Sequence, residues 1–140
     1  MSDDRLQRGM AKLDEIHEGH GREALTAFGQ IHPDFGKFIL EMAFGTIYDR
    51  PGLDLKTRQI CTVAALAAMG DSPDQLKSHV RGALNVGWTR DEIVEVIMQM
   101  GVYGGVPSAV KSGFAALEVF DERGMARPGP PVMPGEEGNS

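Results

Sequence analysis

The sequence has a single cysteine, no long hydrophobic run and no excess of basic residues. One cysteine cannot form a disulfide bond within the chain. The longest apolar-rich run, residues 60–69, is about half of the roughly 20 residues that a membrane helix needs, so we expect no membrane-spanning segment. The opening residues lack the apolar core of a signal peptide, and we therefore expect a cytoplasmic protein.

Acidic residues outnumber basic ones, and the formal net charge is −6. A general nucleic-acid-binding protein needs a basic surface to neutralise phosphates, so this charge argues against one. The cations are nevertheless concentrated in one part of the chain, at Arg50, Lys56, Arg58, Lys77, Arg81 and Arg90. If some of them converge, they could hold a small polyanion; the alternative is that they lie on solvated helix faces.

The composition is that of a folded protein, with 41% apolar and 24% charged residues in a chain of 140. This length suits one domain. No alternating pattern of apolar and polar residues is long enough to predict a sheet. We therefore expect a compact all-α domain over residues 1–124 and a tail over residues 125–140, which hold four of the eight prolines.

Two helix starts carry strong capping signals. Residues 72–75 have a cap serine, a proline at the first helical position and a glutamine at the third, which predicts a helix that runs to Val86. Residues 89–92 form a second capping box before an apolar helix, which should end within residues 101–107. Further helices are predicted near Leu6–Ile16, from Pro33 to a turn at 49–52, from Asp54 to Met69, and from about Ser108 to Arg123. The sequence thus predicts a bundle of about six helices.

His79 is the strongest candidate for chemistry, because it lies inside the best-defined helix and at the edge of its apolar stripe. An imidazole in this position can act as a general acid or base near neutral pH. The alternative is a hydrogen-bonded core histidine. Tyr103 lies in a glycine-rich stretch and could line a pocket, although the glycines could equally serve tight helix packing.

The other polar candidates carry weaker signals. His17, His20 and His32 have no cysteine pair or His-Glu motif beside them, so we expect no metal site. Cys61 lies in an apolar helix, where a thiol is usually an inert hydrophobe. A phosphate-binding glycine loop and a serine nucleophile elbow are both missing, which argues against phosphoryl transfer and serine hydrolysis.

Several motifs resemble the carboxymuconolactone decarboxylase family. They are HVRGALNVG at 79–87, TRDEI at 89–93, YGGVPSA at 103–109, RPGLD at 50–54 and TR at 57–58. The resemblance covers roughly residues 25–122. It implies an alkylhydroperoxidase D-like fold and an obligate homo-oligomer, either a trimer or a hexamer.

The resemblance also implies a reaction, the decarboxylation of 4-carboxymuconolactone or a related carboxylated lactone in the β-ketoadipate pathway of aromatic catabolism. The lactone ring accepts the electron pair, so no cofactor is required. The roles that follow are His79 as proton donor or oxyanion partner, Arg58, Arg50 and Arg81 as carboxylate clamps, Glu41 as a partner that orients the histidine, and Tyr103 as a substrate contact. Arg81 projects from a different helix face than His79, so it would reach the site only across a subunit boundary.

Two alternatives remain open. Alkylhydroperoxidase D-like relatives use a Cys-x-x-Cys pair followed by a histidine, and the two cysteine positions here are Ser72 and Gln75. A thiol-dependent oxidoreductase would therefore need Cys61 and an external thiol. The second alternative is a non-catalytic oligomeric family member. Gly104 also replaces a cysteine that many of the decarboxylases carry.

Overall fold

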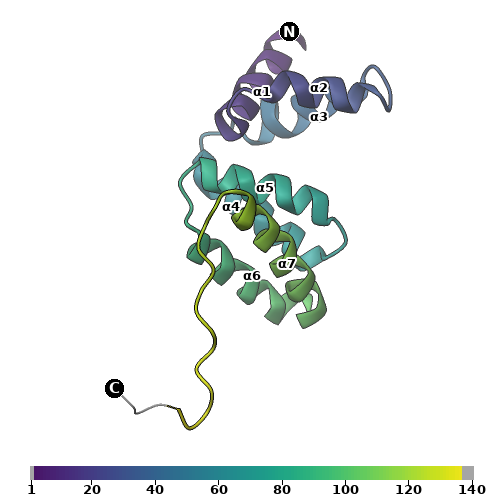
Figure 1. The fold of residues 1–140 in the computed structure, drawn as a ribbon. Coiled ribbons are helices and arrows are strands. Elements are labelled where there is room, and N and C mark those ends of the chain that lie inside the picture. The colour runs from purple at the N-terminus through teal and green to yellow at the C-terminus, as the bar shows by residue number, and fades with distance from the viewer. Residues whose placement is uncertain (1, 137–140) are drawn as a thin grey trace.

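The computed structural model describes residues 2–136, and over these residues it consists of helices and connecting loops (Figure 1). The elements in chain order are α1 (Ser2–His17), α2 (Gly21–Gly29), α3 (Phe35–Ile39), the π-helix η1 (Leu40–Ile47), α4 (Leu55–Met69), α5 (Pro73–Asn85), α6 (Arg90–Gly104) and α7 (Val106–Glu122). The all-α prediction is confirmed.

The helix boundaries follow the capping chemistry in most places. The Asp54 carboxylate accepts a hydrogen bond from the Thr57 backbone N–H at 2.7 Å and so caps α4. At the start of α6, Thr89 and Glu92 form the reciprocal capping box that the sequence predicts. Ser72 differs, because its hydroxyl donates to the Asp71 carboxylate and makes no cap hydrogen bond to α5.

The sequence prediction differs from the structure in the N-terminal third. It did not include α2, which has no side-chain cap at His20 and spans only nine residues. It predicts one helix from Pro33 to the turn at 49–52, whereas the structure has the short helix α3 followed by the π-helix η1. Further on, the break between the last two helices is a single residue, Gly105, with φ of 100°, so α7 begins at Val106 rather than Ser108.

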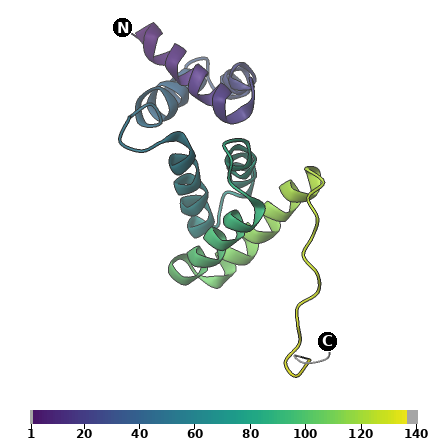
Figure 2. The ribbon, with the colours of Figure 1, turned by 90° about the vertical axis from the view of Figure 1, so that its left-hand side faces the viewer.

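Two clusters of buried side chains hold the helices together. The larger one is formed by α4, α5, α6 and α7, with Val80, Ile93 and Val119 fully buried at its centre. The smaller one is formed mainly by α1 and η1 around Ile16 and Leu40. Figures 1 and 2 show the corresponding arrangement, with α1, α2 and α3 at one end of the molecule and α4 to α7 at the other. A fully buried Leu or Ile stabilises the fold by about 1.5–3 kcal/mol.

The C-terminal segment leaves the helical body after α7 (Figure 2). Met125 still packs against the larger cluster, and Arg127 forms an ion pair with Asp121 at 2.7 Å. Residues 128–136 are exposed and contain neither helix nor strand. The boundary between a helical domain and a tail near residue 124 stays a prediction. Within the described part of the chain, no helix is both long and apolar enough to cross a membrane.

Candidate active site

A cavity of about 620 Å³ lies between the N-terminal helices and the pair α4 and α5. One wall comes from α1 and α2, and includes His17, Glu23 and Phe28. The opposite wall includes Tyr48, Thr62 of α4, and Gln75, Ser78 and His79 of α5. Among the described residues that line the cavity, none is a lysine or an arginine. Its titratable groups are therefore three histidines, one glutamate and one tyrosine.

His79 is held by the side-chain amide of Gln59. The Gln59 Nε2 atom lies 2.9 Å from His79 Nδ1 and donates a second hydrogen bond, also 2.9 Å long, to the His79 carbonyl oxygen. The carbonyl can only accept, so this contact assigns the nitrogen of the amide to the side facing His79. The amide then donates to Nδ1, which must be unprotonated, and the imidazole proton resides on Nε2.

The other end of the Gln59 amide is also engaged. Its Oε1 atom accepts a hydrogen bond from the Tyr48 hydroxyl at 3.3 Å, and the same hydroxyl contacts the Thr62 hydroxyl. Burial raises the pKa of Tyr48, so it is a neutral phenol at neutral pH. Gln59 is fully buried, and a network from three segments of the chain therefore fixes the orientation of His79.

The electrostatics of His79 follow from its position. Burial, with a smaller contribution from the charge of His17, lowers the pKa of the His79 imidazole from 6.5 to about 4. At neutral pH the ring is uncharged and carries its proton on Nε2. Such a group can donate a hydrogen bond to an oxygen atom that gains negative charge during a reaction.

A glycine allows the three helices to meet at this point. A Cβ atom added to Gly82 of α5 would lie 2.6 Å from Gln59 Nε2 and 2.6 Å from the Ile16 side chain of α1. Both contacts are far shorter than ordinary packing distances. The absence of a side chain at Gly82 therefore lets α1 and α4 approach α5 beside His79.

His17 belongs to the same cavity, at the C-terminal end of α1. Its ring centroid lies 6.4 Å from that of His79 in an edge-on arrangement. Burial lowers the pKa of His17, and His20, Arg81 and Arg123 lower it further. His20 is exposed and its Nδ1 atom lies 2.8 Å from a Glu23 carboxylate oxygen.

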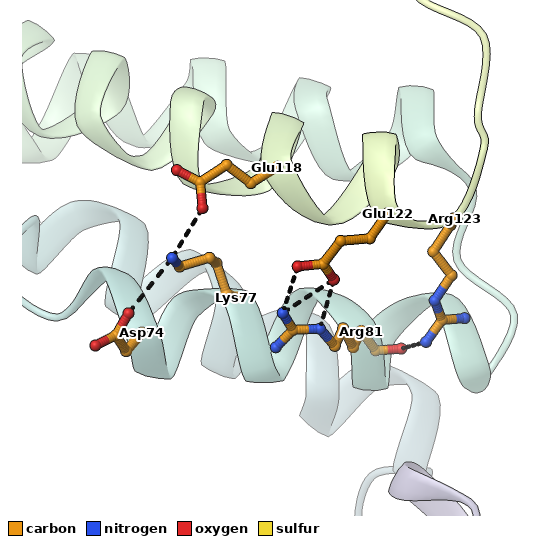
Figure 3. Close-up of polar contacts among 6 residues, drawn as sticks. All are labelled: Asp74, Lys77, Arg81, Glu118, Glu122 and Arg123. Carbon is orange, nitrogen blue, oxygen red and sulfur yellow. Dashed lines mark hydrogen bonds and ion pairs between the residues drawn. The ribbon is translucent and has the colours of Figure 1, made fainter.

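The predicted cationic clamps lie outside this cavity in the single chain. Arg81 forms a two-pronged ion pair with Glu122 of α7, with N–O distances of 2.9 and 3.1 Å (Figure 3). One turn earlier on the same face of α5, Lys77 pairs with Glu118 at 2.9 Å. The six cations of residues 50–90 therefore do not converge on His79.

The four remaining predicted site residues are spread over three helices and the loop before α4. Arg58 donates from Nη2 to the Arg50 carbonyl oxygen at 3.1 Å, and its buried Nε atom has no hydrogen-bond partner among the described residues. Glu41 of η1 likewise has a buried carboxylate oxygen without a partner there. Tyr103, near the end of α6, is 82% exposed. None of the four lines the cavity, and their functional roles stay predictions.

Packing accounts for Gly104. A Cβ atom there would lie 2.6 Å from the Ala68 carbonyl oxygen and 2.7 Å from its Cα, both backbone atoms of α4. A cysteine at this position would require α4 and α6 to separate. Cys61, the thiol that an oxidoreductase would need, is exposed on α4 and does not line the cavity.

Sequence reasoning missed three residues of the site, namely Tyr48, Gln59 and His17. Gln59 could have been found, because it lies four and eight residues before Val63 and Ala67 and so shares their buried helix face. A buried amide needs hydrogen-bond partners, which marks it as part of a polar network. Within residues 2–136, no cluster of three or more His, Cys, Asp or Glu side chains is arranged to hold a metal ion.

Comparisons with known proteins agree with this architecture. A sequence model of the carboxymuconolactone decarboxylase family matches residues 33–119, which include Gln59 and His79. The 4-carboxymuconolactone decarboxylase of Acinetobacter baylyi is 34% identical over 123 residues, or 87% of this chain and 91% of that protein. An uncharacterized 15.0 kDa protein of Paracoccus denitrificans is 38% identical over 99 residues, which cover 70% of this chain and 74% of that protein.

A fungal protein is also similar. The nitrosuccinic acid decarboxylase of Metarhizium robertsii is 38% identical over 86 residues, or 61% of this chain and 59% of that protein. The family match covers the helices that carry Gln59 and His79, and the Acinetobacter relative matches most of the chain. The chain therefore belongs to the carboxymuconolactone decarboxylase family.

Proposed function

We propose that this chain is a carboxy-lyase that decarboxylates 4-carboxymuconolactone, or a closely related carboxylated lactone, in the cytoplasmic catabolism of aromatic compounds. The observation that carries the proposal is the His79 imidazole, which lines a cavity of about 620 Å³ and whose Nδ1 atom accepts a hydrogen bond from a buried amide, so that its proton resides on Nε2. A cavity of this size accommodates a small organic acid.

The chemistry requires little beyond this arrangement. As the carbon–carboxylate bond breaks, CO₂ leaves and the electron pair moves into the lactone system, where oxygen takes the negative charge. A proton then adds to carbon and the lactone carbonyl forms again. His79 serves as proton donor or oxyanion partner, and the ring of the substrate acts as the electron sink, so that no cofactor takes part.

The names of two relatives support the same reaction class. One is a 4-carboxymuconolactone decarboxylase and the other a nitrosuccinic acid decarboxylase. A conjugated lactone and a nitro group can both delocalise the electron pair that CO₂ leaves behind onto oxygen. A site that stabilises an oxyanion therefore suits both compounds, and we assign this chain to the lactone because the Acinetobacter relative matches more of its length.

We further propose that the active form is a homo-oligomer, a trimer or a hexamer. Large apolar side chains are exposed on α6 and α7, namely Met98, Val102, Val110 and Phe114. Exposed apolar side chains on two helices that pack together are typical of subunit interfaces. In such an assembly Arg50, Arg58 and Arg81 would bind substrate carboxylates, Glu41 would orient a catalytic group, and Tyr103 would contact the substrate of a neighbouring subunit.

The test is direct. Purified protein is mixed with enzymatically generated 4-carboxymuconolactone, and the loss of ultraviolet absorbance is followed together with CO₂ release. The His79→Ala variant should lose turnover and keep its helical circular dichroism. His32→Ala removes an exposed histidine outside the cavity and should keep wild-type activity. Full activity of His79→Ala, or no CO₂ from the wild-type protein, would refute the proposal.

A further inference from the structure

The proposed substrate carries carboxylates, yet the described lining of the cavity has no lysine or arginine. The basic side chains of this lining are the imidazoles of His17, His20 and His79. Within one subunit, an imidazole of this lining must therefore be protonated to compensate a carboxylate in the cavity, because an uncompensated charge is costly in a mostly apolar site; an arginine that binds another carboxylate would come from the assembly proposed above.

His79 is a poor carrier of this charge for a geometric reason. Its Nδ1 atom accepts a hydrogen bond from Gln59 Nε2, and a second proton on the ring would place two donors against each other. The amide cannot turn over without setting its oxygen against the His79 carbonyl oxygen. Neutral His79 could release its Nε2 proton only by becoming an anion.

His20 is also unsuited to the role. Its side chain is 62% exposed and its Nδ1 atom already lies beside the Glu23 carboxylate. His17 differs from both neighbours, because it is partly buried, lines the cavity, and makes no side-chain hydrogen bond within the described part of the chain. Its ring lies 6.4 Å from that of His79, so one small ligand can contact both rings.

We propose that His17 is a second catalytic residue, which binds the substrate carboxylate as an imidazolium and gives its proton to carbon while neutral His79 holds the oxyanion. The assignment rests on the decarboxylation proposed above. His17 lies outside residues 33–119, the part that matches the family model.

The bond between carbon and the departing carboxylate breaks, CO₂ leaves, and the electron pair passes to the lactone oxygen, which accepts a hydrogen bond from His79 Nε2. The pair then returns through the ring to form a bond between carbon and the proton of His17. His17 becomes neutral and takes its next proton from water, so each turnover consumes one proton and releases one CO₂.

Binding and protonation are coupled at His17. The titratable and charged groups around it are His20, Glu23, Tyr48, His79, Arg81 and Arg123. In the free protein, burial is the main cause that lowers the pKa of His17, and the cationic neighbours act in the same direction. A bound carboxylate acts in the opposite direction, since it favours the charged imidazole. The free enzyme must therefore gain a proton before or during productive binding.

The experiment measures kcat/KM for 4-carboxymuconolactone as a function of pH. For the wild-type protein we expect kcat/KM to fall by about tenfold per pH unit between about pH 6.5 and 8.5, because ever fewer molecules carry the required proton. The His17→Gln variant should lose on the order of 10²-fold at the lower pH and become independent of pH. His32→Gln, an exposed histidine outside the cavity, should reproduce the wild-type profile.

Circular dichroism checks that His17→Gln is folded; if it is not, the wild-type pH profile alone decides. A wild-type kcat/KM that stays constant over this range overturns the assignment, as does a folded His17→Gln variant with the wild-type profile. Both of these outcomes leave decarboxylation itself established. Absence of CO₂ release from the wild-type protein refutes the proposed function, and the role of His17 with it.

Discussion

The Gln59 amide nitrogen donates hydrogen bonds to two atoms of the same residue, the Nδ1 atom and the carbonyl oxygen of His79. The second contact prevents the amide from turning over, and the first sets the tautomer of the imidazole. A single buried side chain thereby decides which ring nitrogen presents a proton to the cavity.

Gln59→Glu should place a proton on His79 Nδ1. A carboxylate accepts hydrogen bonds and favours the charged imidazole, and it would also repel the His79 carbonyl oxygen. This repulsion would displace the ring from the position that Gln59 fixes, and we expect kcat to fall by on the order of 10²-fold, the effect of losing one oxyanion donor. Nitrogen NMR of the imidazole should show a proton on Nδ1. Gln99→Glu, on the exposed face of α6, is the matched control and should change neither signal nor rate.

The stability of the protein should fall as the pH is lowered from about 6.5 to 4, in part because of His79. Its pKa is about 4 in the folded chain and near 6.5 in the unfolded chain, so the unfolded state binds more protons in this window. This histidine contributes a loss of about 3 kcal/mol across the window, at about 1.4 kcal/mol per pKa unit. Urea unfolding of wild type and His79→Gln at several pH values measures the difference. Parallel curves for the two proteins would contradict the prediction.

Gly104→Ala should destabilise the protein by about 1–3 kcal/mol, because the new methyl group would collide with the Ala68 backbone. Gly113→Ala is a matched control within α7, where an added Cβ meets nothing within 4 Å. That change should stabilise the fold by about 0.5–1 kcal/mol, since alanine is the better helix former. Urea midpoints give both values. If the urea midpoints of both variants shifted by the same amount in the same direction, the contact between α4 and α6 would not be tight.

Arg58→Gln should raise KM for the lactone by about 10- to 100-fold and change kcat much less, if Arg58 binds a substrate carboxylate in the assembled enzyme. The reason is that a carboxylate which stays bound throughout the reaction contributes equally to ground state and transition state. Arg127→Gln removes an arginine that pairs with Asp121 near the C-terminal segment and serves as the control. An unchanged KM in Arg58→Gln would remove this arginine from the binding site.

The sequence predicted what depends on local chemistry. The capping box at Thr89, the cap at Asp54 and the apolar stripes place five of the helices within a few residues of their positions in the structure. It did not predict α2, because that helix lacks a side-chain cap. It did not predict the π-helix η1 either, because an apolar stripe fits an α-helix and a π-helix nearly as well.

The site was harder to predict for the same reason. His79 was identified from its helix, but its partner Gln59, and the Tyr48 hydroxyl that binds Gln59, come from segments that only the tertiary fold brings together. The arginines show most clearly that local sequence does not predict long-range partners. Arg81 pairs with a glutamate 41 residues further along the chain, and nothing in the local sequence indicates that partner.

The two walls of the cavity belong to different parts of the chain. The chemical groups Gln59 and His79 lie on α4 and α5, whereas Leu13, Ala24 and Phe28 close the opposite side from α1 and α2. A substitution of one of these three apolar residues reshapes the space offered to the ligand and leaves both imidazoles, His79 of α5 and His17 of α1, in place. The outline of the accepted acid can therefore change independently of the groups proposed to carry the reaction.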